Sequence, residues 1–339
     1  MPQIITAKAP MWELCWRDEL KAAISDPKVL LEALGLPLQN REHDLAARRL
    51  FALRVPRPFL ALMEKGNAQD PLLRQVMTDQ AEFTDAQGFS TDPLGEQDAA
   101  VPGLLHKYQS RVLFILKGGC AVNCRYCFRR HFPYQDNPGN KASWQQALDY
   151  IASRPEIEEV ILSGGDPLMA KDDELAWLIE RLNGIKHLKL LRIHSRLPVV
   201  IPSRIDQSFL DTLAQSALPV TLVLHINHGN EIGEDLAKAC AALRAANVTL
   251  LNQSVLLAGI NDDAEVLVAL SHRLFAAGIL PYYLHVLDKV QGAAHFLVDD
   301  ERARAIMRQL NARLSGYLVP RLAREEAGKP GKTLMDLKL

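Results

Sequence analysis

After about residue 100 the chain alternates short apolar runs with amphipathic segments. The apolar runs are bounded by turn residues, which is typical of β-strands, and the segments between them carry apolar residues at helical spacing. The predicted strands are RVLFILKG (111–118), EVILSG (159–164), LKLLRIHS (188–195), VTLVLHIN (220–227), TLLNQSVLL (249–257) and YYLHVLD (282–288). The predicted helices between them are SWQQALDYIASR, DELAWLIERLNG, QSFLDTLAQS, GEDLAKACAALRAAN and DAEVLVALSHRLFAAG.

Strands that alternate with helices indicate repeated βα units and a parallel sheet. A further helix, ERARAIMRQLNARLSG, follows the last strand. Six units are fewer than the eight that close a (β/α)8 barrel. We therefore predict an α/β fold built as a partial (β/α)6 parallel barrel or an open sheet, with a C-terminal segment beyond it.

The first 95 residues have a different pattern. Segments such as ELKAAISDPKVLLEALGL and REHDLAARRLFALRV show helical spacing and are interrupted by prolines. The stretch DAQGFSTDPLGEQDAAVPG (85–103) is polar and rich in turn residues. We expect an N-terminal helical region over 1–95 and the barrel over 96–339.

Polar residues collect at the ends of the predicted strands. In parallel folds the carboxyl ends of the strands line the active site. Because several strands contribute independently, we expect a site at this edge. The residues are the cysteine cluster after the first strand, Gly164–Asp166 after the second, His194–Arg196 at the third, His225–His228 at the fourth, Asn252–Ser254 within the fifth and Asp288 at the sixth.

Composition excludes several classes of protein. Of 339 residues, 48% are hydrophobic and 23% charged, and the net charge of −1 gives no overall basic field for nucleic acid or anionic membrane. The sequence shows no apolar run long enough to span a bilayer and no signal-peptide pattern at its start. We expect a cytoplasmic protein without a nucleic-acid or membrane partner.

Three of the five cysteines form a C-x3-C-x2-C cluster, GGCAVNCRYCFRR. Five cysteines are too few for a disulfide framework, and we expect Cys15 and Cys240 to be buried small hydrophobic residues. Three thiolates with His131 as a fourth ligand suit zinc. Three thiolates alone suit an iron–sulfur cluster that keeps one iron open. The spacing leaves both alternatives standing.

This motif, after the first strand of a six-unit partial barrel, resembles the radical S-adenosylmethionine enzymes. The resemblance implies that three thiolates hold a [4Fe–4S] cluster and that the open iron binds the amino and carboxylate groups of S-adenosylmethionine. An electron from the cluster then cleaves that molecule to give a 5′-deoxyadenosyl radical. The implied ligands are Cys120, Cys124 and Cys127.

From about residue 100 onward the chain resembles the lysine 2,3-aminomutase family. It is most similar to the short branch that supplies (R)-β-lysine for modification of elongation factor P, since it stops seven residues after Lys332. The motifs that carry this resemblance are SGGDPL (163–168), RIHSRLPVVIPSRI (192–205), HINHGNEI (225–232), NQSVLLAGIND (252–262), YYLHVLD (282–288), SGYLVP (315–320) and GKPGKT (328–333).

The family combines the radical with pyridoxal 5′-phosphate. The resemblance implies that Lys332, in the segment 316–339, holds this cofactor covalently, with Lys329 as the rival. It also implies that Lys107 and Arg111 bind the phosphate.

The resemblance assigns the remaining site residues as well. Arg129 would bind the substrate's α-carboxylate, and Asp288 and Glu325 its ε-ammonium; Glu325 stands where the family has an aspartate and is one methylene longer. The residues expected around S-adenosylmethionine are Gly164, Gly165 and Asp166 on its amino end, and His225 and Gln253 on its nucleoside side. The longer aminomutases carry extra cysteines that are absent here, so we expect no zinc.

The expected reaction is the isomerisation of L-α-lysine to β-lysine, with regeneration of S-adenosylmethionine. The expected partners are an electron donor, a ligase that modifies elongation factor P and a second copy of the chain. Two alternatives stay open: an aminomutase that produces free β-lysine, and a zinc-binding interaction module.

Overall fold

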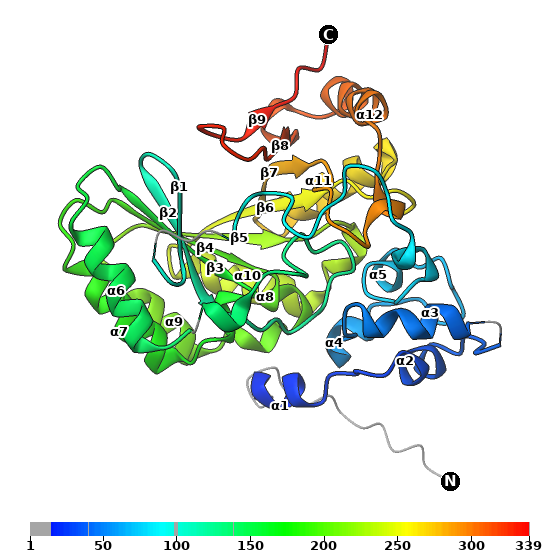
Figure 1. Cartoon of the computed structure of the whole chain (residues 1–339), viewed down its shortest axis with the longest axis horizontal. Helices are drawn as coiled ribbons and strands as arrows, with labels where there is room; N and C mark the ends of the chain where they lie inside the picture. The colour runs from blue at the N-terminus through cyan, green and yellow to red at the C-terminus, as the bar shows by residue number, and fades with distance from the viewer. Residues whose placement is uncertain (1–14, 40, 98–100, 138, 339) are drawn as a thin grey trace.

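The computed structural model describes residues 15–39, 41–97, 101–137 and 139–338, so the start of the chain, where no signal peptide is expected, lies outside it. Its centre is one nine-stranded sheet in which the strands follow one another in sequence order (Figure 1). Strands β2 to β8 are parallel, and β1 and β9 pair antiparallel at the two edges. The strands are β1 (Leu104–Tyr108), β2 (Arg111–Lys117), β3 (Glu159–Gly164), β4 (Leu190–Ser195), β5 (Val220–His225), β6 (Thr249–Val255), β7 (Leu280–His285), β8 (Arg321–Arg324) and β9 (Thr333–Leu334).

All six predicted strands are present as β2 to β7, so the predicted α/β fold with a parallel sheet is confirmed. The structure adds a seventh parallel strand, β8, and two antiparallel edge strands. These additions were not predicted because LLHKY, RLAR and TL are short and partly charged. Pairing with a neighbouring strand, rather than their own periodicity, makes them strands.

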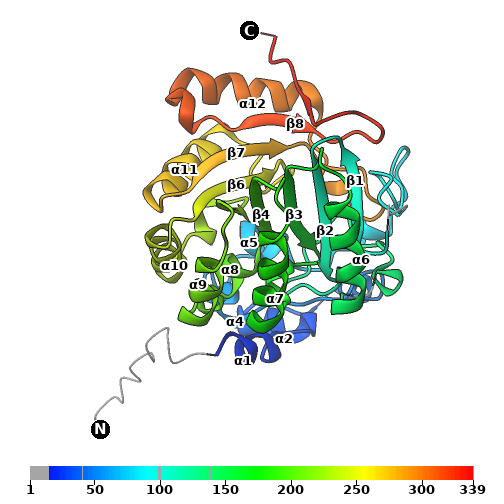
Figure 2. The ribbon, with the colours of Figure 1, turned by 90° about the vertical axis from the view of Figure 1, so that its left-hand side faces the viewer.

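The long helices cover one face of this sheet (Figure 2). Each places apolar residues at helical spacing against it; α7, for example, buries Leu175, Leu178, Ile179 and Leu182. No helix in the described part of the chain is long and apolar enough to cross a membrane. These helices are α6 (Lys141–Ala152), α7 (Asp172–Asn183), α9 (Gln207–Ala214), α10 (Glu234–Ala245), α11 (Ala264–Ala276) and α12 (Asp300–Arg313), with the short α8 (Leu197–Val200) between β4 and α9.

The opposite side of the sheet, called here the inner face, is packed less completely. Along β6 the exposure alternates, with Asn252 and Ser254 buried towards α11 and Gln253 half-exposed on the inner face. The same alternation places His194 of β4 on the inner face, and in β7 His285 follows the buried Leu284; both imidazoles are largely buried. A closed eight-stranded barrel fills its interior with side chains. This partial barrel keeps polar, partly uncovered side chains there instead.

Short helices precede the sheet, as expected for the N-terminal region, and pack into the same hydrophobic core as the barrel. Trp16 and Phe59 join Phe114 and Trp144 in that core. The burial expected of Cys240 is confirmed, but that of Cys15 is wrong: it precedes the first turn of α1, where Trp16 takes the buried position. These helices are α1 (Trp16–Lys21), α2 (Pro27–Ala33), α3 (Glu42–Ala46), α4 (Arg57–Leu60) and α5 (Pro71–Arg74), followed by the 3-10 turn η3 (Gln80–Phe83).

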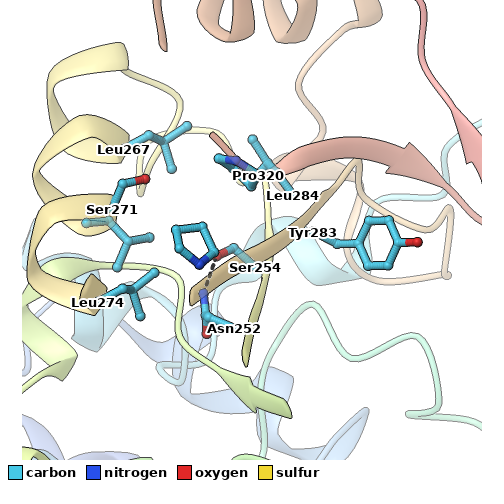
Figure 3. A pocket seen from close by; sticks show the side chains of 10 residues that line it. Asn252, Ser254, Leu267, Ser271, Leu274, Tyr283, Leu284 and Pro320 are labelled. Atoms are coloured by element: carbon cyan, nitrogen blue, oxygen red, sulfur yellow. Dashed lines mark hydrogen bonds between the residues drawn. The ribbon is translucent and has the colours of Figure 1, made fainter. Parts of the chain in front are cut away.

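A small cavity lies between α11 and the helix-covered face of β6 and β7 (Figure 3). Its volume of about 10 Å³ has room for about one water molecule. Leu267, Leu270 and Leu274 line it on one side, and Asn252 and Ser254 on the other. Tyr283 points away from it, towards the inner face. The cavity is a packing gap behind the sheet and is too small for a substrate.

Candidate functional site

The cysteine loop, residues 118–130, follows β2 and is supported by the N-terminal region. Arg54 donates a hydrogen bond from Nη1 to the carbonyl oxygen of Cys120 at 3.1 Å. The backbone of Asn123 donates to the carbonyl of Arg54 at 3.1 Å, and that of Arg125 to the carbonyl of Gln75 at 2.9 Å. The conformation that presents the thiols therefore depends on chain segments far away in sequence.

Two of the three thiols, those of Cys120 and Cys127, lie in an environment that disfavours negative charge until a cation is bound. Burial, and then the neighbouring thiols, raise the pKa of Cys127 to about 11 and raise that of Cys120 well above its ordinary value. Arg196 donates from Nη1 to the sulfur of Cys124 at 2.7 Å. A metal cluster supplies the missing positive charge, so the donor set fits an iron–sulfur cluster.

The zinc alternative depends on His131 as the fourth ligand. His131, the candidate fourth ligand, has its Nε2 3.3 Å from the carbonyl oxygen of Gln291. A tetrahedral zinc site needs all four ligands at one centre. A cluster needs no such convergence, because each thiolate binds a different iron.

Gly164 and Gly165 lie where the end of β3 crosses the start of the cysteine loop. Gly164 has a φ of +129°, and a Cβ there would stand 2.4 Å from the carbonyl oxygen of Lys117. A Cβ on Gly165 would stand 2.6 Å from the carbonyl oxygen of Gly119. Only glycine permits this close backbone approach. The two residues hold the cysteine loop against the sheet.

Asp166, expected near S-adenosylmethionine, uses both carboxylate oxygens within the chain. Oδ1 accepts from the hydroxyl of Ser195 at 2.8 Å and from the backbone of Leu168 at 3.0 Å. Oδ2 accepts from the backbone of Arg196 at 2.8 Å and of Leu197 at 2.9 Å. Asp166 therefore joins the ends of β3 and β4, and no oxygen is left for a first contact with a ligand.

Arg129 extends from the cysteine loop and is held on two sides. Its Nε donates to Glu96 at 2.6 Å, and its Nη1 donates to the hydroxyl of Ser163 at 2.9 Å and the carbonyl of Gly164 at 3.1 Å. Burial lowers the pKa of Arg129, but the Glu96 carboxylate outweighs burial and the pKa stands above its ordinary value. Within the ranges that the structure describes, Nη2 of this charged guanidinium has no hydrogen-bond partner, so it can donate to a ligand.

The predicted phosphate-binding pair lies on the β1–β2 hairpin, close to the C-terminal segment. Lys107 donates to Glu96 at 2.8 Å and stands 3.8 Å from Glu325. The guanidinium of Arg111 lies 4.2 Å from the ring centre of Tyr108. Tyr108 in turn donates its hydroxyl proton to Glu325 at 2.6 Å. The edge strand β1 and the residue after β8, Glu325, therefore meet through these side chains.

Lys332 lies just before β9 and reaches the inner face. Its ammonium forms an ion pair with Glu325 and stands 5.8 Å from the ring centre of Tyr283. Burial, and then the nearby Lys332, lower the pKa of His285 to about 3, so that imidazole is neutral. Lys329, the rival lysine, is exposed, and its backbone alone is hydrogen-bonded, to Glu326. The geometry thus brings Lys332, and not Lys329, to the inner face.

Asp288 lies just after β7, in surroundings that only weakly stabilise the negative charge of its carboxylate. Burial raises its pKa to about 7, although the nearby Lys332 opposes this effect. In the part of the chain that the structure describes, no donor is hydrogen-bonded to its side chain. An incoming ammonium would find an acceptor here that still lacks a partner.

His225 and Gln253, expected on the nucleoside side, are register partners on β5 and β6. The Nε2 atom of His225 lies 2.9 Å from the hydroxyl of Tyr126, and burial, followed by Arg196, lowers the pKa of His225 well below its usual value. Both residues lie at the rim, on the side of the cysteine loop.

Sequence reasoning missed several residues that complete the site. Glu96 lies in the polar stretch that was interpreted as a boundary, where nothing in the pattern distinguishes a buried carboxylate from a solvated one. Arg196 was seen only as part of a strand end, but it binds Glu231 at 2.9 Å, Gln75 at 2.7 Å and Tyr126 at 2.6 Å. The one sequence signal for Arg196 was its position as a charged residue directly beside apolar strand residues.

The chain is similar to one family model and to several known proteins. Residues 114–270 match the model of the Radical SAM superfamily. The L-lysine 2,3-aminomutase of Haemophilus influenzae is 64% identical over 94% of this chain and 95% of its own length. That of Escherichia coli is 58% identical over 100% and 99%. That of Clostridium subterminale is 36% identical over 94% of this chain and 77% of its own length.

Among solved structures, a radical S-adenosylmethionine methyltransferase, TsrM, from Kitasatospora setae is similar, with a TM-score of 0.44 and 12% sequence identity. It matches 68% of this chain and 57% of its own.

Proposed function

The chain belongs to the L-lysine 2,3-aminomutase family of the radical S-adenosylmethionine superfamily, and from this membership we propose that it isomerises L-α-lysine to β-lysine with the help of pyridoxal phosphate. The protein is an isomerase, and the zinc-binding interaction module is thereby excluded. The observation that carries the proposal is the meeting of the cysteine loop, Arg129, Asp288 and Lys332 around one inner face.

Membership of the superfamily implies a [4Fe–4S] cluster and S-adenosylmethionine, which together supply a 5′-deoxyadenosyl radical when bound. Cys120, Cys124 and Cys127 would hold the cluster. Arg196 keeps the Cys124 sulfur in place through its N–H donor. Gly164 and Gly165, at the end of β3, let the backbone of the cysteine loop come close to the sheet. His225 and Gln253 would contact the nucleoside part of S-adenosylmethionine. Asp166 would act indirectly, by joining the ends of β3 and β4.

Pyridoxal phosphate, when bound, supplies a conjugated ring that delocalises an unpaired electron beside the migrating nitrogen. Lys332 is suited to hold it, because its amine reaches the inner face beside Tyr283. Lys107 and Arg111 would bind the phosphate, one as a point charge and one as a planar fork. The imidazole of His285 is neutral, so it places no positive charge beside the cofactor ring.

The two ends of lysine match two sides of the site. Arg129 offers a charged N–H edge to the α-carboxylate. Asp288 offers an unpaired carboxylate to the ε-ammonium, and binding a cation there lowers its raised pKa. These residues orient the substrate between the two sides of the site.

Glu325 is the second acceptor proposed for the ε-ammonium. In this structure it already binds an ammonium, that of Lys332. It also accepts from the hydroxyl of Tyr108 at 2.6 Å. A substrate ammonium would therefore share Glu325 with these partners, in a pocket that the longer side chain, compared with the family's aspartate, makes shorter or differently angled.

The decisive experiment is an anaerobic assay. Reconstituted and reduced protein, given S-adenosylmethionine, pyridoxal phosphate and L-lysine, is expected to yield β-lysine, with iron and sulfide bound to the wild type and lost in Cys120→Ala. Isomerisation of another amino acid, or release of 5′-deoxyadenosine without β-lysine, would contradict the substrate assignment.

We further propose that the product serves modification of elongation factor P, through a ligase, in the cytoplasm. The similarity to the short branch of the family supports this destination. Genetic rescue of elongation factor P modification by the wild type, and not by Lys332→Ala, is the expected result. Production of β-lysine without such rescue would favour a producer of free β-lysine. Analytical sedimentation of the pure protein would test the proposed homo-oligomer. Reduction of the reconstituted cluster by candidate flavoproteins would test which protein donates the electron.

A further inference from the structure

Glu96 is a buried carboxylate in the segment that leads into β1, and its side chain is 5% exposed. The turn before it is fixed by Asp92, whose carboxylate accepts from the backbone N–H of Glu96 at 2.9 Å and of Gln97 at 3.2 Å. The backbone of this segment is therefore held independently of the contacts that the Glu96 side chain makes.

The two oxygens of Glu96 bind two different cations. Oε2 accepts from Nε of Arg129 at 2.6 Å, and Oε1 accepts from Nζ of Lys107 at 2.8 Å. Arg129 comes from the cysteine loop and Lys107 from β1, at separate places in the fold. One carboxylate thus fixes the separation between the two cations.

The remaining contacts show which donors are left for ligands. Arg129 uses Nη1 for Ser163 and Gly164, so Glu96 and β3 hold the guanidinium on two edges. Lys107 also donates to the carbonyl oxygen of Leu94 at 3.3 Å. Among the described residues, Nη2 of Arg129 has no partner. Without Glu96 the guanidinium loses one of its two anchors, and within the described ranges Lys107 keeps only the more distant Glu325 carboxylate, at 3.8 Å.

We propose that Glu96 is a positioning residue that couples the carboxylate subsite of the amino acid, at Arg129, to the phosphate subsite of the cofactor, at Lys107. This inference rests on the proposed function, which assigns a substrate carboxylate to one cation and a phosphate to the other. A single side chain sets the distance between the two subsites, so both affinities depend on it together.

The experiment compares Glu96→Gln and Glu96→Asp with the wild type. Glutamine keeps the shape and loses the charge, and aspartate keeps the charge and loses reach. Each cluster-loaded protein is titrated with pyridoxal phosphate by absorbance in the absence of lysine, and KM and kcat for L-lysine are then measured. Glu174→Gln is the matched control, because Glu174 likewise accepts from a lysine, Lys117, at 2.9 Å and from a backbone N–H at 2.9 Å, on α7 outside the site.

We expect the Kd for pyridoxal phosphate and the KM for lysine both to rise roughly tenfold or more in Glu96→Gln, since a charged hydrogen bond is lost at each cation. Iron and sulfide content should stay at the wild-type level, and Glu174→Gln should leave both constants unchanged. Glu96→Asp should fall between the wild type and Glu96→Gln.

Wild-type constants in Glu96→Gln, with or without a lower melting temperature, would overturn the inference. So would a rise in one constant alone, because the coupling requires both. If Glu96→Gln does not fold, Glu96→Asp decides by the same criteria. A wild type that neither binds pyridoxal phosphate nor isomerises lysine would overturn the proposed function itself, and this inference with it.

Discussion

At the residue scale, the site contains charges that are shielded from water and therefore depend on one another. Lys332, Glu325, Lys107, Glu96 and Arg129 form a continuous chain of ion pairs across the inner face. Charges alternate in sign along this chain; although burial raises the pKa values of Glu96 and Glu325, the neighbouring cations hold them below their usual range. A charged ligand that binds here replaces one ion-pair partner in this network with another, so no buried charge is left without a counter-charge.

Replacing Lys332 tests the assignment of the cofactor lysine. We expect Lys332→Ala to lose the pyridoxal absorbance band of the purified protein, because the amine that bonds the cofactor is gone. Lys329→Ala, which changes an exposed lysine three residues away, should keep it. Loss of the band in Lys329→Ala and its survival in Lys332→Ala would reverse the assignment.

The raised pKa of Asp288 predicts a pH dependence. Only the deprotonated carboxylate binds an ammonium strongly, and burial raises its pKa to about 7. As the pH falls below 7 a growing fraction of Asp288 is protonated, so KM for lysine should rise, approaching tenfold per pH unit. Initial rates measured from about one pH unit below the pKa of Asp288 to about one unit above it give this KM as a function of pH. In Asp288→Asn we expect a higher KM that does not change over the same range.

At the element scale, the end of β3 positions the cysteine loop through close backbone contact. Gly164→Ala places a methyl group against the carbonyl oxygen of Lys117 and imposes a φ that L-residues avoid. We expect it to destabilise the protein by roughly 3 kcal/mol, measured by denaturant unfolding. Gly316→Ala, where no atom lies within 4 Å, is the control and should have little effect. Equal stability of the two variants would contradict this account of the loop.

The strands and helices of the barrel could be predicted from the sequence, because each carries its own periodicity. Strands β1 and β8 could not, since LLHKY and RLAR become strands only through their neighbours. The motif residues of the site were found through resemblance to a family. Glu96 and Arg196 were missed because their importance comes from tertiary contacts, and a polar residue in a loop or at a strand end has no sequence signal of burial. The division of the chain at residue 95 stays a prediction.

At the scale of the whole molecule, the N-terminal helices and the cysteine loop form one structural unit. Glu82 in η3 accepts from Arg125, and it also accepts from Arg130 at 2.8 Å, with all three side chains at most 1% exposed. Arg125 continues to the carbonyl oxygen of Phe51 at 2.7 Å. The loop that presents the thiols is thus anchored to the segment before the barrel.

Removing this buried carboxylate should affect both stability and the metal site. Glu82→Gln leaves two buried guanidinium groups without a counter-charge, and we expect a loss of about 3 kcal/mol or more in the free energy of unfolding. Iron content after reconstitution should also fall, because the loop loses its anchor. Glu265→Gln, which removes an exposed pair with Arg313, should change neither. Full iron incorporation in Glu82→Gln would show that the loop holds its shape without the helices.

The sheet ends in β1 on one side and β9 on the other, and in the described part of the chain no backbone ladder joins the two edges. Instead, Tyr108 and Lys107 of β1 meet Glu325 after β8 through side chains alone. Side-chain contacts can break and re-form while every strand keeps its pairing. Between β1 and Glu325 the wall of the partial barrel is therefore closed by side chains alone, directly beside Lys332.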